Sequence, residues 1–297
     1  MNFQTSVTGK WILAGEHSVL RGSPAIVFPL FSRTLDFSFE SPQKGEEKEL
    51  TLELDGEHGK EMQLIFWGVI EKACHLKNIH RNDLSGKIKL KSSIPIGAGL
   101  GASAALCSAV ARWFQSMNLA QHSELLEFSR NLENLFHGES SGVDVAVALS
   151  AKPLVYVRNG LSRIFIPSWQ PKWFLSYSGH RGVTLDCVTK VKKILEDDFQ
   201  NGALVDSDMQ VAVGMCEAAL SLPEEIGYPR LVEAIELAES CFERWGLVEN
   251  SSQQMNWLRS KGAVAVKPTG SGDGGYILSL WKEEPSAEVL KKLIPCF

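Results

Sequence analysis

The chain has 297 residues, of which 44% are hydrophobic and 22% are charged, and its formal net charge is −5. A chain of this length and composition can bury a large core, so we expect about two folded domains and no extended disorder. The acidic balance, without a basic stripe of interleaved aromatic residues, excludes a general nucleic-acid partner. No run of about 18 apolar residues is present and no cationic leader precedes the first apolar run, so we expect a cytoplasmic protein with no membrane partner.

The first half of the chain mixes strand and helix patterns. Alternating or short apolar runs predict strands at 11–15, 24–30, 33–40, 49–54 and 86–93. Apolar residues at helical spacing predict helices at 61–77, 103–117 and 122–137, the last ended by Gly138. A glycine-rich stretch, IPIGAGLGASAAL at 94–106, lies between the strand at 86–93 and the helix that follows it.

The second half is mostly helical. Strands are expected at 153–158 and 173–178, on either side of a boundary segment, IPSWQPK, at 166–172. Helices are expected at 184–199, 206–221, 230–245 and 251–260, followed by strands at 262–267 and 274–281. The second glycine-rich segment, PTGSGDGG, joins these last two strands. The mixed order predicts an α+β protein, with a mixed sheet and helices in an N-terminal domain and helices with an antiparallel sheet in a C-terminal domain.

Six cysteines are scattered along the chain and never approach C-x-x-C spacing. Most of them lie in apolar helical contexts such as ALCSAV, where a free cysteine behaves as a small hydrophobic residue. We therefore expect neither a zinc site nor a disulfide framework.

The glycines at 97–101 have two interpretations. They either allow close packing of two elements or expose backbone N–H groups to a phosphate at the start of a helix. The stretch is not a P-loop, because no Lys-Ser or Lys-Thr follows the glycines. Ser103 supplies the one hydroxyl in the first turn of the helix, where it could reach a phosphate-bound Mg²⁺.

Two acidic residues and one basic residue are candidates for chemistry. Glu133 either faces solvent on its helix or, with Ser103, holds Mg²⁺, which prefers oxygen ligands. Asp144, in ESSGVDVAVAL, is either a helix-start acid or a reactive carboxylate. Lys10 precedes an apolar strand and either faces solvent or stabilises charge on a reacting oxygen. His17 is either a structural histidine or, with Glu16, lines a polar pocket.

Three segments in a fixed order carry a resemblance to a known family. GKWILAGEHSVLRGSPAI, IPIGAGLGASAAL and KPTGSGDGGYILSL together resemble the signature segments of the GHMP small-molecule kinases, over landmarks from residue 8 to about 280. GEHSVL and ENLFHGESSGVD are most similar to the branch of that family that phosphorylates mevalonate. The resemblance implies a two-domain GHMP kinase fold, with a nucleotide- and substrate-binding domain at 1–168 and a domain at 169–297 that closes over the active site.

The resemblance also implies residue roles. Asp144 matches the catalytic base and Lys10 the lysine that favours the alkoxide, while Ser103 and Glu133 match the Mg²⁺ ligands. The nucleotide-binding positions are Ser92, Gly97, Ala98, Gly99, Leu100, Gly101, Ala102 and Ser103. The substrate positions are Glu16, His17, Gly142 and Thr184. Arg158, Arg163 and Arg181 are all candidates for binding the substrate carboxylate, and we choose Arg158 because it lies on the strand that follows the SGVD segment.

Three departures from the family pattern are present. Ala102 stands where the family commonly has a serine, Asp273 interrupts a glycine run that is usually uncharged, and His180 with Arg181 occupy positions that usually differ. The last two bear on the acceptor more than on the reaction type.

The resemblance implies ATP- and Mg²⁺-dependent phosphorylation of the terminal hydroxyl of mevalonate, a step of isoprenoid precursor synthesis. Two alternatives stay open: another GHMP kinase, acting on phosphomevalonate or a sugar, or an inactive ligand sensor of the same fold. The sequence leaves the assembly open and allows a homodimer.

Overall fold

The structure is a computed structural model that describes residues 2–42, 49–55, 59–138 and 140–297. Glu139, within the segment HGESSGVD, lies outside the described residues. The chain forms two compact units that are not continuous in sequence. Unit 1 comprises Met1–Gly9, Arg33–Ile96 and Gly101–Ala151, and unit 2 comprises Lys10–Ser32, Gly97–Leu100 and Lys152–Phe297. The division by role at residue 168 stays a prediction.

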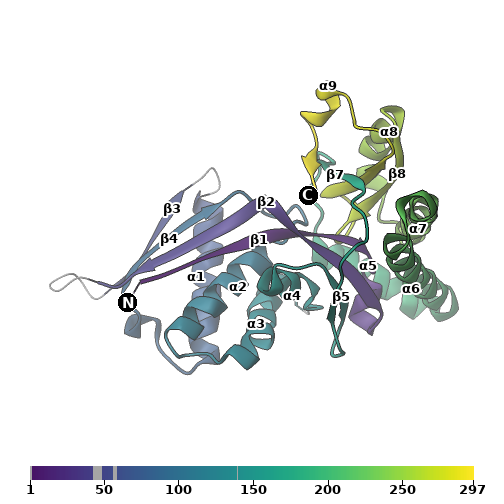
Figure 1. Cartoon of the computed structure of the whole chain (residues 1–297). Helices are drawn as coiled ribbons and strands as arrows, with labels where there is room; N and C mark the ends of the chain where they lie inside the picture. The colour runs from purple at the N-terminus through teal and green to yellow at the C-terminus, as the bar shows by residue number, and fades with distance from the viewer. Residues whose placement is uncertain (1, 43–48, 56–58, 139) are drawn as a thin grey trace. The chain divides into compact units, whose positions relative to one another are not determined.

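Unit 1 is a sheet with helices on one face (Figure 1). Strand β3 (Leu50–Asp55) runs parallel to β4 (Gly86–Ser92), which pairs antiparallel with residues 35–40 of β2 (Pro24–Glu40). Helices α1 (Gly59–Leu76), α3 (Leu125–His137) and α4 (Val143–Ser150) all contact α2 (Ala102–Ser116). Small residues dominate α2, and this helix can therefore be buried among three others.

The alternating sequence of β4 explains which face of the sheet each of its side chains occupies. Ile88 and Leu90 alternate with lysines and are buried, while the lysines face the other side of the sheet and pair with acidic neighbours. Trp113 of α2 packs against Phe37 and Phe39 of β2, which fixes the helix on the sheet.

Unit 2 contains a four-stranded antiparallel sheet in the order β10-β7-β9-β8. The strands are β7 (Lys172–Tyr177), β8 (Ala263–Thr269), β9 (Tyr276–Trp281) and β10 (Ile294–Pro295). The helices are α5 (Thr184–Asp197), α6 (Phe199–Ser221), α7 (Glu224–Arg244), α8 (Ser252–Ser260) and α9 (Ala287–Leu290). Helices α7 and α8 contact β8, and α6 packs along α7.

Strands β1 (Asn2–Ala14) and β2 contribute residues to both units. In unit 2, residues 24–27 of β2 pair with β5 (Leu154–Val157), which also pairs with β6 (Arg163–Ile164). Trp11 of β1 stacks on Phe28 of β2, and Trp173 meets both rings edge-on. This aromatic cluster forms part of the core of unit 2.

The mixed α+β architecture expected from the sequence is confirmed, with four local differences. The two strands expected at 24–30 and 33–40 are one strand, β2. Helix α6 begins at Phe199 because the Asp198 side chain caps it, accepting a hydrogen bond from the Asn201 N–H at 3.1 Å. Helix α7 begins before Pro229, which sits inside it. The valine-rich VDVAVALS segment forms α4, a helix that the sequence indicates only through Asp144 as a possible helix-start acid.

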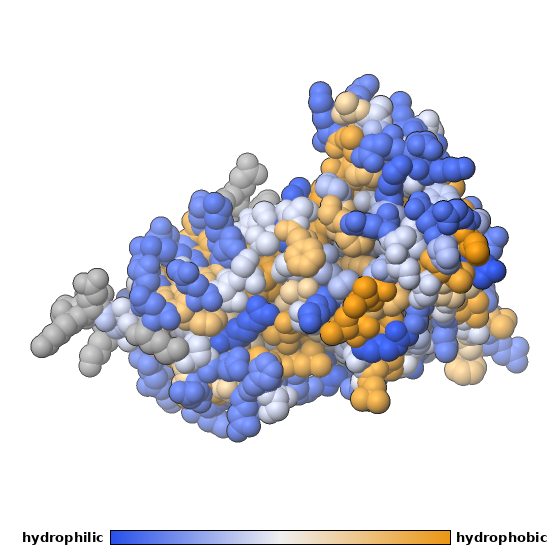
Figure 2. All heavy atoms as spheres, in the orientation of Figure 1, coloured by the Kyte–Doolittle hydropathy of each residue, from blue (hydrophilic) through white to orange (hydrophobic). Residues whose placement is uncertain are grey.

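On the face that Figure 2 shows, an apolar area lies around the β5–β6 hairpin. Leu161, Ile164 and Ile166 are exposed there. No helix in the described ranges is long and apolar enough to cross a bilayer. All six cysteines are free and buried, in agreement with the sequence-based expectation.

Candidate functional site

The start of helix α2 in unit 1 is shaped by a glycine. Gly101 is the N-cap residue and has φ 81°, in the left-handed region, and no side chain caps the helix at this position. The first N–H groups of an α-helix have no partner within the helix and carry the positive end of its dipole. Ala102 and Ser103 form the first turn, so this end can receive an anion close to the backbone.

Glu133 is buried on α3 and does not face solvent. Its carboxylate accepts a hydrogen bond from the Ser140 hydroxyl, with Oγ and Oε2 2.5 Å apart. Burial raises the pKa of the Cys107 thiol well above its usual value, and the charge of Glu133 raises it further. Cys107 lies one turn after Ser103 on α2.

Ser140 connects Glu133 to the segment that carries Asp144. Its hydroxyl donates to Glu133 and accepts from the Gly142 N–H at 3.0 Å, while its own N–H donates to the Asn134 side chain at 2.7 Å. Gly142, with φ 85°, is the N-cap residue of α4, and Asp144 lies in the first turn of that helix. One buried hydroxyl therefore orders the start of α4 relative to α3.

Ser92 lies at the end of β4 and makes a tight local turn. Its hydroxyl accepts from the Ile94 N–H at 3.2 Å and lies 3.4 Å from the Ile94 carbonyl oxygen. Its nucleotide-binding role stays a prediction.

The two glycine-rich segments lie against each other in unit 2, although about 170 residues separate them in sequence. A Cβ placed on Gly275 would lie 2.9 Å from the Ala98 carbonyl oxygen, a distance that real Cβ atoms do not tolerate. A Cβ placed on Gly99 would lie 3.4 Å from the Thr269 carbonyl oxygen. The Lys10 N–H donates to the Leu100 carbonyl at 3.0 Å, so β1 is bonded to the last residue of the segment at 97–100.

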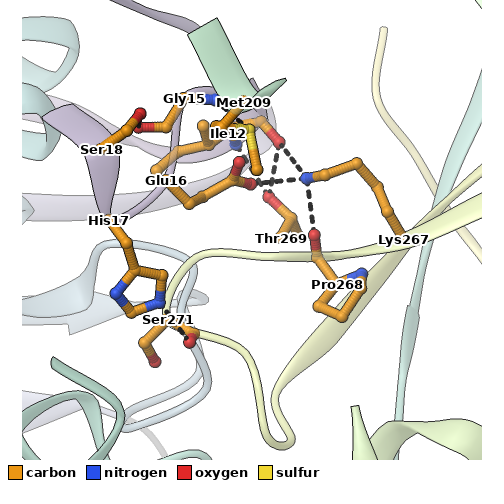
Figure 3. Close-up of polar contacts among 10 residues, drawn as sticks. All are labelled: Ile12, Gly15, Glu16, His17, Ser18, Met209, Lys267, Pro268, Thr269 and Ser271. Atoms are coloured by element: carbon orange, nitrogen blue, oxygen red, sulfur yellow. Dashed lines mark hydrogen bonds and ion pairs between the residues drawn. The ribbon is translucent and has the colours of Figure 1, made fainter. Parts of the chain in front are cut away.

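A buried ion pair joins the GEH segment to the second glycine-rich segment (Figure 3). Lys267 is fully buried, and its Nζ donates to Glu16 Oε1 at 2.5 Å and to the Pro268 carbonyl at 2.6 Å. Burial raises the pKa of Glu16, while the Lys267 charge and hydrogen bond act in the opposite direction, with a smaller contribution from Lys10. The Thr269 hydroxyl adds two further bonds, accepting from the Ile12 N–H at 2.8 Å and donating to its carbonyl at 2.9 Å.

His17 contacts the same segment. Its Nε2 lies 2.9 Å from the Ser271 carbonyl oxygen, and its ring packs edge-on against Trp245. Burial lowers the pKa of His17 to about 4, so the imidazole is neutral at pH 7 and Nε2 is the donor. Glu16 Oε2 and His17 Nδ1 are buried polar atoms with no hydrogen-bond partner among the described residues.

The three arginines that are candidates for binding the substrate carboxylate make different contacts. Arg158 Nη1 donates to the Leu20 carbonyl at 2.8 Å, next to the GEH segment, and Arg163 forms an exposed ion pair with Glu217. The Arg181 side chain lies beside the loop at 97–100. Thr184, at the first turn of α5, has its hydroxyl 3.4 Å from the Ser271 hydroxyl.

Asp273 forms hydrogen bonds that hold the second glycine-rich segment to Asn250. Its φ of 50° is in the left-handed region, which aspartate adopts more readily than most residues. Its carboxylate accepts from the Asn250 N–H at 3.3 Å and from the Asn250 side chain at 3.2 Å. The aspartate therefore replaces a glycine without backbone conflict and ties the second glycine-rich segment to the turn before α8.

Sequence reasoning missed three residues of these arrangements: Lys267, Thr269 and Ser140. A lysine between valine and proline in an apolar strand, VAVKPT, was the available signal for Lys267, because a charged residue in a buried strand needs a partner. Ser140 carried no distinguishing pattern.

The residue types at the start of α2 and on α3 are those that a phosphate-bound Mg²⁺ uses, and their role as its ligands stays a prediction. Ser103 and Glu133 offer a hydroxyl and a carboxylate, and the start of α2 offers N–H groups. Within the described ranges, no three His, Cys, Asp or Glu side chains gather in a cluster that could hold a metal. A magnesium ion at such a site would complete its coordination with phosphate oxygens and water.

Comparison with known proteins finds similar sequences and similar structures. The sequence profile of the GHMP kinases N terminal domain matches residues 65–152. The chain is 30% identical to a mevalonate kinase of Aeropyrum pernix, an alignment that covers 94% of this chain and 89% of that protein. It is 27% identical to a mevalonate kinase of Thermococcus sibiricus, over 96% of this chain and 91% of that protein.

A solved structure shares the fold. The L. major mevalonate kinase in complex with R-mevalonate has a TM-score of 0.77 to this structure at 20% identity, covering 98% of this chain and 89% of that one.

Proposed function

The chain belongs to the GHMP kinase family and is an ATP-dependent small-molecule kinase, and from this premise we propose that it phosphorylates the terminal hydroxyl of mevalonate to give 5-phosphomevalonate. The observation that carries the proposal is the similarity to a mevalonate kinase over 94% of the chain. The segments GEHSVL and HGESSGVD, which favour this acceptor, lie within that length.

Phosphoryl transfer asks the protein mainly for positioning and charge neutralisation. We assign Asp144 as the base that takes the proton of the acceptor hydroxyl and Lys10 as the cation that stabilises the resulting alkoxide. The oxygen then bonds to the γ-phosphorus, and ADP leaves with the electron pair of the broken phosphoanhydride bond. Bound Mg²⁺ would neutralise phosphate charge, held by Ser103 and Glu133.

The substrate roles of Glu16 and His17 are supported by their buried polar atoms. Buried polar groups in folded proteins almost always have a partner. Glu16 Oε2 and His17 Nδ1, which both accept hydrogen bonds, have none among the described residues, so a hydroxyl of the acceptor, which can donate, is a suitable partner for either of them. Arg158, Thr184 and Gly142 complete the proposed acceptor residues.

Asp273 resembles an acidic residue in the third signature segment of phosphomevalonate kinases, and this resemblance alone would favour phosphomevalonate as the acceptor. The Asp273 carboxylate is instead engaged by Asn250, and its contacts are explained without an acceptor. We therefore propose mevalonate.

The test is a panel of acceptors with ATP and Mg²⁺: mevalonate, phosphomevalonate, galactose and homoserine, with ADP release as the readout. Mevalonate should show the highest kcat/KM. Equal or better turnover of phosphomevalonate would refute the acceptor assignment.

Two variants test the roles of the acids. Asp144→Asn should lower kcat at least about a hundredfold, the usual range for loss of a general base, with little change in Mg·ATP affinity. Glu133→Gln should raise the Mg²⁺ requirement, and added Mg²⁺ should recover part of the activity. Rescue of Asp144→Asn by Mg²⁺, with Glu133→Gln unaffected, would show that the two assignments are exchanged.

A further inference from the structure

Three backbone segments of unit 2 stack on one another: the loop at 97–100, the segment at 270–275 and the segment SGHRG at 178–182. The Gly275 N–H donates to the His180 carbonyl at 2.8 Å, and the Ser178 N–H donates to the Gly275 carbonyl at 2.9 Å. A Cβ placed on Gly182 would lie 2.7 Å from the Gly272 carbonyl oxygen. The backbone on both sides of Arg181 is therefore fixed.

From this position the Arg181 side chain reaches the glycine loop. A Cβ placed on Gly97 would lie 3.8 Å from Arg181 Cδ and 3.9 Å from Arg181 Nη1, which is ordinary van der Waals contact. Arg181 is exposed, so its charge is kept without the desolvation cost of a buried cation. The loop GAGLGAS contains no basic residue, so Arg181 supplies a positive charge that the loop itself lacks.

We propose that Arg181 binds the polyphosphate of the nucleotide at the glycine loop. A guanidinium presents parallel N–H donors that match phosphate oxygens, and charge-assisted bonds of this kind are about twice as strong as neutral ones. The role assigned here differs from a grip on the acceptor carboxylate, for which Arg158, bound to the Leu20 carbonyl beside the GEH segment, is better placed. The inference rests on the proposed function only in that the nucleotide occupies this loop.

The test measures nucleotide binding without an acceptor, so that it does not depend on turnover. Titration calorimetry gives the Kd of ADP, of adenosine and of mevalonate for the wild-type chain and for Arg181→Gln. Loss of a charged hydrogen-bonding group should weaken ADP binding about ten- to a hundredfold. Adenosine, which has no phosphate, and mevalonate should bind unchanged.

Two further variants control the result. Arg181→Lys keeps the charge but loses the paired donors, so it should recover part of the ADP affinity. Arg230→Gln removes another exposed arginine, on α7, and should leave ADP affinity unchanged. Melting temperatures confirm that each variant is folded.

The outcomes separate the inference from the proposed function. Unchanged ADP affinity in Arg181→Gln, or a loss confined to mevalonate, would overturn the inference while leaving mevalonate turnover by the wild-type chain intact. A wild-type chain that prefers another acceptor, with ADP binding still dependent on Arg181, would refute the acceptor assignment alone.

Discussion

Replacing Lys267 with methionine removes the countercharge of a buried carboxylate. Lys267 is 0% exposed and Glu16 is 2% exposed, and their bond is 2.5 Å long. Methionine has a similar length and no charge, so Lys267→Met leaves little cavity. The main effect is a carboxylate held away from water without a partner.

The expected cost follows from this burial. Breaking a buried ion pair by removing one partner destabilises a protein by about 3–5 kcal/mol, because the remaining charge is uncompensated. The cost should depend on pH. In the wild-type protein the Lys267 charge and hydrogen bond oppose the rise that burial causes in the pKa of Glu16, so the folded-state pKa is higher still in Lys267→Met.

A carboxyl group whose folded-state pKa is raised contributes stability below its unfolded-state pKa and loses that contribution as pH rises through the folded-state value. The deficit of Lys267→Met relative to wild type should therefore be largest near pH 8 and smaller near pH 5. Glu16→Gln in the same chain should restore part of the stability at pH 8, since no charge is then left buried.

The assay is urea denaturation of wild type, both single variants and the double variant at the two pH values, analysed as a double-mutant cycle. Lys87→Met is the matched control. Lys87 pairs with Glu53 at 2.5 Å, but both side chains are about half exposed, so little change is expected. A Lys267→Met deficit below about 1 kcal/mol, or one independent of pH, would refute the assignment of Glu16 as a buried charge stabilised by Lys267.

Three other predictions follow from the site. Ser140→Ala should lower kcat and raise the Mg²⁺ requirement by releasing Glu133, whereas Ser141→Ala should change the Mg²⁺ requirement less; equal effects would contradict the role of the Ser140 hydroxyl. Because burial lowers the pKa of His17 from 6.5 to about 4, the unfolded chain takes up a proton that the folded chain does not, and stability should fall by about 3 kcal/mol as pH drops through that window. His17→Gln should flatten the dependence of the unfolding free energy on pH in this window, as measured by urea denaturation at several pH values. An unchanged pH dependence would contradict a buried neutral imidazole. Gly101→Asn should fold but bind ADP more weakly in calorimetry. Unchanged ADP affinity would show that phosphate does not bind at the start of α2.

Much of the fold could be predicted because its signals are local. The alternation in GKIKLKSS and the apolar spacing at 103–117 identify β4 and α2, and each depends on neighbours within a few residues. The sequence indicates helix α4 only weakly because VDVAVAL contains three valines, and β-branched residues favour strands. Its helical state depends on the cap at Gly142 and on packing against α2.

The contacts of the candidate site could not be predicted, because they join distant parts of the chain. Glu16 and Lys267 are 251 positions apart, and neither carries a local pattern that names the other. The sequence predicts a substrate-binding role for Glu16, but it does not reveal that one oxygen of Glu16 is used by an internal ion pair. Asp273 shows the converse: as a departure from the family pattern it suggested an effect on the choice of acceptor, while the left-handed backbone and the Asn250 bonds explain it structurally.

The two interpretations of the glycine-rich stretch are compatible, because different glycines meet different demands. Gly99 allows close packing, since a Cβ there would lie 3.4 Å from the Thr269 carbonyl oxygen of the second glycine-rich segment. Gly101 is required by a φ of 81° before any ligand is considered, so a β-branched residue there would strain the start of α2 whether or not phosphate binds. Loss of nucleotide binding in Gly101→Val would therefore not distinguish a phosphate site from a disturbed helix start. Asparagine tolerates the left-handed conformation and caps helices well, so in that variant a loss of ADP affinity can be assigned to the added side chain.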